Sequence, residues 1–418
     1  MELPRHSTLW RHISEKMPMS TRSRPVDSLP HIGLPLPFSV PQAQGTTFMD
    51  LFYWDTYFTN LGLLSLGDLR QAKNNVDDIL CLIERYGYMP NAANTGLLNR
   101  SQPPYASMMV RDIYERTGDR AWLSGAVETL KKEYDFWMTE RGTPSGLNRH
   151  FNSATKAELL EFYAYISSER FPAMGKIPRP DDEKAKIASN YLSEAEGGWD
   201  FNPRFGGVCE EYNPVDLNAN LYIYERNFAW FCRELGQNGA KIWEKKAKTR
   251  RNLIQKLCFE PSDGLFYDYN YVTGRRSGVF SSAVFSLLWA GIPTTEQAAS
   301  LVENLDRLEC AHGIAACEDG ERDAVYQWDW PNAWASFNVL AVSGLNRYGY
   351  GADAARVAGK YLDSVSAIYG RTGQLWEKYN AVTGDIDVKD EYAMPGDFMG
   401  WTAGAYLLCY DYLRACAE

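Results

Sequence analysis

The sequence of 418 residues has little of what marks a protein that binds polyanions. Its 43 lysines and arginines are outnumbered by 53 aspartates and glutamates, which gives a formal net charge of −10. A basic run at residues 245–251 falls on an expected amphipathic helix, where such a run is typical of a solvated face. The composition therefore argues against nucleic acid as a partner.

Long hydrophobic runs and clustered histidines are also missing. The longest apolar stretches, such as VFSSAVFSLLWAGI, are shorter than a membrane span and contain polar residues. The N-terminal residues lack the basic-then-apolar order of a signal peptide. The five histidines show no spacing typical of metal ligands. The sequence predicts no membrane anchor and no metal site.

Cysteine is present, but its spacing shows no recognisable motif. The eight cysteines are scattered, form no CxxC motif, and mostly fall in apolar helical runs, where they act as small hydrophobes. This pattern favours a reducing compartment and hence the cytoplasm, with disulfides as the alternative.

What is abundant is helical periodicity. From Tyr57 onward, apolar residues recur at spacings of three to four over about twelve segments, which alternate between mostly apolar and amphipathic. Six inner helices inside six outer ones make an all-α (α/α)6 toroid whose funnel is built from loops. An open solenoid would show a short sequence repeat, and none is found. Residues 1–45 are predicted to form a Pro-rich N-terminal arm packed on the barrel, and residues 46–418 the toroid.

The predicted loops share an unusual composition. Each combines Trp or Tyr with carboxylate, amide or guanidinium side chains, in the segments FMDLFYWDTY, GYMPNAANTGLLNRSQPP, GGWDFNPRF, AVYQWDWPNAW, LWEKYN and VKDEYAMPGDFMGW. Aromatic faces stack on sugar rings, while planar polar groups bind hydroxyls. The loops therefore predict a sugar-binding site.

Asp200 stands between Trp199 and Phe201 in a glycine-rich loop. Low-polarity walls raise the pKa of a carboxyl, and a raised pKa suits a general acid that protonates a glycosidic oxygen. The alternative is a helix N-cap beside core aromatics.

At this point the chain resembles the trehalase family of glycoside hydrolases, whose members fold as (α/α)6 toroids. The resemblance rests on these segments in order: FYWDTY (52–57), LNRSQPP (98–104), GGWDF (197–201), PVDLNANLY (214–222), QWDWPNAW (327–334), EKYN (377–380), DEY (390–392) and GWTAGAYL (400–407).

The resemblance implies an inverting α-glycosidase that acts on a small soluble glycoside without metal or cofactor. Asp200 would be the general acid and Glu391 of the DEY motif the general base, with carboxyls roughly 6.5–9.5 Å apart. The implied sugar-binding residues are Phe48, Tyr53, Trp54, Asp55, Asn91, Arg100, Gln102, Trp328 and Trp401, and the same motifs add Trp199, Gln327 and Asp329. Asp55 and Asp329 have the alternative of structural carboxylates, and Arg100 that of a loop organiser.

Two departures from the family pattern bear on the substrate. Thr47 and Leu192 stand where the family carries arginines, so trehalose is expected to bind more weakly. Arg204 and Lys389 are candidates to replace the lost contacts. Related glucosyl- or mannosylglycerate hydrolases and a non-catalytic sugar-binding toroid are the alternatives, and the oligomeric state stays open.

Overall fold

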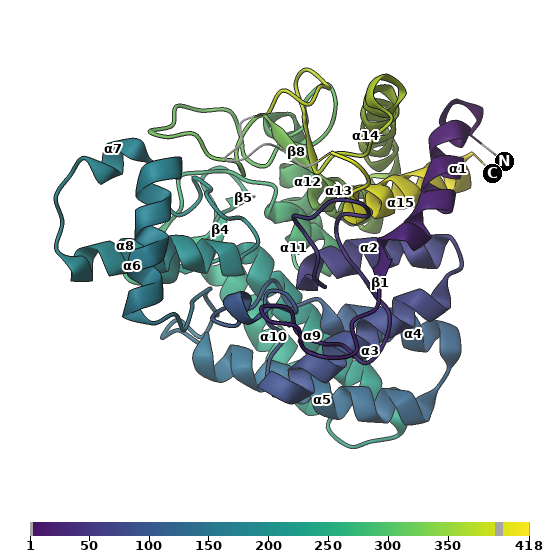
Figure 1. Cartoon of the computed structure of the whole chain (residues 1–418), viewed down its shortest axis with the longest axis horizontal. Helices are drawn as coiled ribbons and strands as arrows, with labels where there is room; N and C mark the ends of the chain where they lie inside the picture. The colour runs from purple at the N-terminus through teal and green to yellow at the C-terminus, as the bar shows by residue number, and fades with distance from the viewer. Residues whose placement is uncertain (1–2, 389–395, 418) are drawn as a thin grey trace.

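The computed structural model describes residues 3–388 and 396–417. Within these residues the chain forms fifteen α-helices joined by long loops (Figure 1). The helices are α1 (Ser7–Lys16), α2 (Tyr53–Ser65), α3 (Leu69–Tyr86), α4 (Ala106–Thr117), α5 (Arg120–Glu140), α6 (Lys156–Tyr165), α7 (Pro172–Gly175), α8 (Asp181–Glu196), α9 (Val215–Leu235), α10 (Ala240–Leu257), α11 (Val284–Ala290), α12 (Thr295–Glu303), α13 (Ala335–Arg347), α14 (Gly351–Thr372) and α15 (Gly400–Cys416).

Six of these helices close into a ring. Contacts run from α2 to α4, then to α9, α11, α13 and α15, and α15 packs back against α2. Helices α3, α5, α10 and α14 cover this ring from outside, each packed on one or more of its members. The predicted (α/α)6 toroid is confirmed, because helices that are apolar on most sides, such as α13 and α15, are buried in the ring.

Helices α6, α7 and α8 stand apart from the ring, although the α6 segment is one of the twelve that the sequence predicts for the alternation. In Figure 1 they form a teal group at one side, where α6 packs on α8. A π-helical turn at Ile166–Arg170 ends α6 and leads into α7. The aromatic residues of this group form their own small core with Phe201, which brings the group to the loop that contains Asp200.

The strands are all short and lie in the loops. They are β1 (Thr21–Arg22), β2 (Phe38–Ser39), β3 (Tyr212–Asn213), β4 (Phe259–Glu260), β5 (Leu265–Phe266), β6 (Tyr269–Asn270), β7 (Arg275–Arg276), β8 (Asn332–Trp334) and β9 (Lys378–Asn380). The antiparallel pair β8–β9 matters most here, with Trp334 opposite Lys378, because it places the QWDWPNAW and EKYN motifs side by side.

The N-terminal segment lies along the ring. Trp10 of α1 is 6.2 Å from Tyr410 of α15 between ring centroids, and Phe38 is fully buried in the main core. The domain boundary at residue 45 stays a prediction. All eight cysteines are free thiols. In the described residues, no helix is both long and apolar enough to cross a membrane.

Candidate active site

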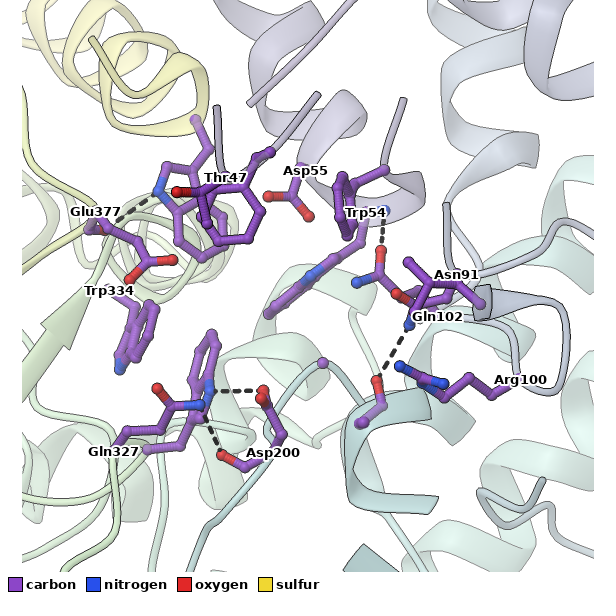
Figure 2. A pocket seen from close by; sticks show the side chains of 17 residues that line it. Thr47, Trp54, Asp55, Asn91, Arg100, Gln102, Asp200, Gln327, Trp334 and Glu377 are labelled. Atoms are coloured by element: carbon purple, nitrogen blue, oxygen red, sulfur yellow. Dashed lines mark hydrogen bonds between the residues drawn. The ribbon is translucent and has the colours of Figure 1, made fainter. Parts of the chain in front are cut away.

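A cavity of about 270 Å³ opens where several ring helices begin (Figure 2). Trp54 and Asp55 lie in the first turn of α2, Trp334 precedes α13, and Trp401 lies in the first turn of α15. The cavity brings together most of the predicted site: Phe48, Trp54, Asp55, Asn91, Arg100, Gln102, Asp200, Gln327, Trp328 and Trp401. Long-range packing has therefore collected residues from five separate motifs.

The loop that carries Asp200 is held from both sides. Gly198 has φ of +72°, and a Cβ at this position would lie 2.7 Å from the Trp54 ring, so only glycine allows the loop to pack so closely. On the other side, the fully buried Glu194 accepts hydrogen bonds from the backbone N–H groups of Phe201 and Asn202, at 3.1 and 3.3 Å. Asp200 begins no helix, so the N-cap alternative is wrong.

The carboxyl of Asp200 points into the cavity. The indole Nε1 of Trp328 donates to its Oδ1 at 3.2 Å, and the amide of Gln327 donates to the Asp200 backbone carbonyl at 3.1 Å. Burial raises the pKa of Asp200, and the nearby carboxylate of Glu377 raises it further. A protonated Asp200 can donate to an oxygen in the cavity.

Glu377 is a second acidic residue of the cavity that the sequence reasoning did not assign a role. It is 5% exposed, and Nζ of the fully buried Lys378 donates to its Oε2 at 2.9 Å. Its backbone carbonyl accepts from Nε1 of Trp401 at 3.1 Å. The EKYN motif forms part of the family pattern, but the sequence prediction placed the base on the next motif, DEY.

Asp55 is the third carboxyl of the cavity. Burial raises its pKa to about 7, and the charges of Glu377 and Asp200 act in the same direction. Figure 2 shows the three carboxyls directed into the cavity from different sides. Like charges at close range disfavour ionisation, so the arrangement favours the protonated form of Asp55 and Asp200.

Arg100 supplies the opposite charge. Burial lowers the pKa of its guanidinium to about 10, while Asp200 acts to raise it, so the group stays protonated at neutral pH. The loop around it is fixed by Glu196, whose Oε2 accepts from the backbone N–H of Ser101 at 3.0 Å. Burial opposes ionisation of Glu196, but the paired Arg141 lowers its pKa to about 2. Glu196 is thus the loop organiser, and Arg100 faces the cavity.

Two amides join this loop to its neighbours. Gln102 accepts from the backbone N–H of Trp54 at 3.1 Å. Asn91 donates to the carbonyls of Ser101 and Ala195 at 2.9 and 3.3 Å. Both side chains line the cavity, and they also join the loop before α4 to α2 and to α8.

Indole rings form the apolar wall. Trp328 stacks on Trp334 with centroids 3.6 Å apart and planes 4° from parallel, and Trp54 lies 5.6 Å from Trp328. Trp401 meets Trp54 edge-on at 5.9 Å. Together with three carboxyls and a guanidinium, these rings offer stacking faces and hydroxyl partners of the kind that a sugar needs. Sequence reasoning missed Trp334, although it lies in a motif that the sequence singled out.

Three predicted binding residues lie outside the cavity lining. Tyr53 is fully buried, and its hydroxyl accepts from the backbone N–H of Ala106 at 2.9 Å. Trp199 supports the wall from behind, 5.6 Å from Trp328. Asp329 pairs with Arg322 at 3.0 Å, which matches the structural alternative.

The structure also corrects the prediction about the residues that would alter the choice of substrate. Arg204 is not available to a ligand, because its guanidinium is buried between Asp216 and Asp268 at 2.9 Å from each. Leu192 is buried in α8 and does not line the cavity, whereas Thr47 does. Lys389 and Glu391, with the predicted carboxyl separation, lie outside the described residues.

Comparison with known proteins identifies the family. A family profile described as trehalase matches residues 5–414. The periplasmic trehalase of Xanthomonas oryzae pv. oryzae is 30% identical over 430 residues, covering 96% of this chain and 73% of that protein. The cytosolic neutral trehalase of Saccharomyces cerevisiae is 30% identical over 444 residues, covering 91% of this chain and 57% of that protein.

Solved structures agree as well. The structure of the neutral trehalase Nth1 of Saccharomyces cerevisiae matches with a TM-score of 0.76 at 29% identity, covering 91% of this chain and 74% of that chain. The GH63 mannosylglycerate hydrolase of Thermus thermophilus shares the fold, with a TM-score of 0.66 at 18% identity, covering 96% of this chain and 99% of that chain. The chain belongs to the trehalase family and is a glycoside hydrolase.

Proposed function

We propose that this protein hydrolyses α,α-trehalose with inversion of configuration. One observation carries the proposal: Asp200, with a raised pKa, and Glu377, paired with Lys378, line the same indole-walled cavity. A pair of carboxyls in one sugar-sized cavity is the requirement for hydrolysis of a glycosidic bond. The names of the relatives point to trehalose as the sugar.

Asp200 is proposed as the general acid. Its carboxyl gives a proton to the glycosidic oxygen as the bond from that oxygen to the anomeric carbon breaks. The hydrogen bond from Trp328 orients the carboxyl, and Arg100 is placed to bind substrate hydroxyls beside it. Burial raises the pKa of Asp200 and so favours the protonated form that a general acid needs.

Glu377 is proposed as the general base in place of Glu391. Its carboxylate removes a proton from a water molecule, whose oxygen then attacks the anomeric carbon from the face opposite the leaving group. The ammonium of Lys378 supplies the counter-charge that a nearly buried carboxylate needs. Glu391 remains the competing assignment from the sequence.

Three substitutions test these assignments. We expect D200N and E377Q each to lower kcat at least about 100-fold, as loss of a general acid or base does, while E391Q keeps more activity. E303Q, on the exposed face of α12, is the matched control and should behave as wild type. An active E377Q together with an inactive E391Q would return the base to Glu391.

The stereochemistry of the fresh product tests the inverting route. Proton NMR should show one β-glucose from the attacked ring and one α-glucose from the leaving ring for each trehalose cleaved. Production of α-glucose alone would mean retention and would overturn the proposed mechanism.

The substrate is tested by comparing kcat/KM across trehalose, glucosylglycerate, mannosylglycerate and kojibiose. The case against trehalose is weaker than the sequence indicated, because position 192 does not face the cavity and only Thr47 removes a charged contact there. We expect trehalose to give the highest kcat/KM. A higher value for mannosylglycerate would favour the alternative to which the Thermus fold neighbour points.

The cytoplasmic location is also kept as a proposal. The eight free thiols support it, and the names of the relatives include both a periplasmic and a cytosolic trehalase. Cell fractionation is the measurement that decides between the compartments.

A further inference from the structure

A second cavity, of about 230 Å³, lies among the ring helices away from the candidate active site. Five members of the ring line it: α2, α4, α9, α11 and α13. It reaches Trp289, near the end of α11, and Arg347, the last residue of α13, whereas the active-site cavity lies where α2, α13 and α15 begin. The two cavities have no lining residue in common.

Three arginines from three different helices face this second cavity. They are Arg111 of α4, Arg226 of α9 and Arg347 of α13. Arg111 pairs with Glu115 at 2.8 Å, and Arg226 donates to the hydroxyl of Tyr222 at 3.0 Å.

Neither Arg226 nor Arg347 has a carboxylate within ion-pair distance among the residues that the structure describes. In a chain with a net charge of −10, these two guanidinium groups are cations with no carboxylate partner among the described residues.

The other walls suit a hydroxylated ring. Tyr57, 6% exposed, is held by stacking on Tyr105 with centroids 4.5 Å apart, and Trp289 lies 6.0 Å from Tyr57. Asp112 also faces the cavity, and its carboxyl has no hydrogen-bond partner in the described part of the chain. A carboxyl of this kind can bind a ligand hydroxyl, and aromatic faces can pack on a sugar ring.

We propose that this cavity is a second ligand site, which binds a phosphate group carried by a small sugar. Arg226 and Arg347 hold the phosphate, since guanidinium groups match phosphate oxygens in geometry and charge. Asp112 binds a hydroxyl of the sugar, and Tyr57 with Trp289 contacts its ring. The site is independent of the hydrolytic mechanism, because none of its residues belongs to the catalytic cavity.

Isothermal titration calorimetry on the whole protein tests the site with three probes: glucose 6-phosphate, inorganic phosphate and glucose. We expect glucose 6-phosphate to bind at least about tenfold more tightly than glucose. Stronger binding of glucose 6-phosphate than of phosphate identifies a sugar phosphate as the ligand. Equal binding of the two identifies free phosphate. Either result supports the site.

Substitutions locate the binding. R226Q and R347Q each remove one exposed guanidinium, and each should weaken the binding of glucose 6-phosphate at least about tenfold. R275Q, which removes an equally exposed arginine from β7, should leave the affinity unchanged. Circular dichroism melts confirm that each variant is folded. Absence of binding by both phosphate probes at millimolar concentration, or wild-type affinity in both R226Q and R347Q, would overturn the proposal.

Discussion

At the scale of single residues, the surroundings of each acidic side chain decide its role. Asp55 and Asp329 both sit beside a tryptophan in the sequence, yet Asp55 faces the cavity with a pKa of about 7 and Asp329 is paired with Arg322. Asp216 and Asp268 both pair with Arg204 and also accept backbone N–H groups at the start of α9. Sequence neighbours alone did not separate these roles, because the separating partners come from distant segments.

Arg204 is expected to stabilise the loop that contains Asp200. It is 2% exposed, and R204Q would leave the buried carboxylate of Asp268 and the partly buried one of Asp216 without their counter-charge. We expect a loss of about 3–5 kcal/mol in the free energy of unfolding, measured by urea denaturation. R276Q, which breaks the half-exposed pair with Glu260, should cost less than about 1 kcal/mol. Equal stability of the two variants would show that the ion pairs of Arg204 stabilise the protein no more than the more exposed pair of Arg276 does.

At the scale of elements, the junction between α8 and its following loop builds the catalytic geometry. Two buried glutamate side chains at the end of α8 bind different segments: Glu194 holds the turn after Asp200, and Glu196 holds the segment around Ser101. One helix end thus sets the distance between the general acid and the loop of Arg100.

The close contact between this loop and α2 can be tested with alanine. G198A would place a Cβ 2.7 Å from the Trp54 ring at a φ of +72°. G206A is the matched control, since its φ is +56° and no atom lies within 4 Å of the added Cβ. We expect G206A to cost about 1–2 kcal/mol from the left-handed backbone alone. G198A should cost more in thermal melts and also lower kcat. Identical melting temperatures and activities in the two variants would exclude the steric contact.

At the scale of the whole molecule, buried carboxyls make stability depend on pH. Burial raises the pKa values of Asp55, Asp78, Asp112 and Glu133 to about 7 each. Their pKa values in the unfolded chain lie near 4. Between about pH 4 and 7 the folded state therefore binds more protons, and the free energy of unfolding falls as pH rises.

Asp78 gives the cleanest test of this dependence, because it is fully buried in α3, outside both cavities. We expect D78N to flatten the fall in stability between pH 4 and 7, by up to about 1.4 kcal/mol per pH unit. D135N, at an exposed position of α5, is the control and should keep the wild-type slope. Parallel stability curves for wild type and D78N in urea titrations would contradict the assignment.

The sequence by itself determined the architecture and most of the cavity. Helical periodicity is local, and alternation of apolar with amphipathic helices leaves few ways to bury the apolar ones, so the toroid could be predicted. Asp200 was found from its aromatic neighbours in the sequence, and Trp54 and Gln102 from the resemblance of their motifs to those of the trehalase family.

Tertiary structure decided which residues of those motifs face the cavity. Tyr53, Trp199 and Asp329 turn into the core or toward other partners, while Glu377 and Trp334 reach the cavity through the pairing of β8 with β9. The second cavity could not be predicted from the sequence. Its arginines, Arg111, Arg226 and Arg347, are far apart along the chain and come together only when the ring closes. A side chain's direction depends on packing between distant elements, and no local pattern of residues encodes it.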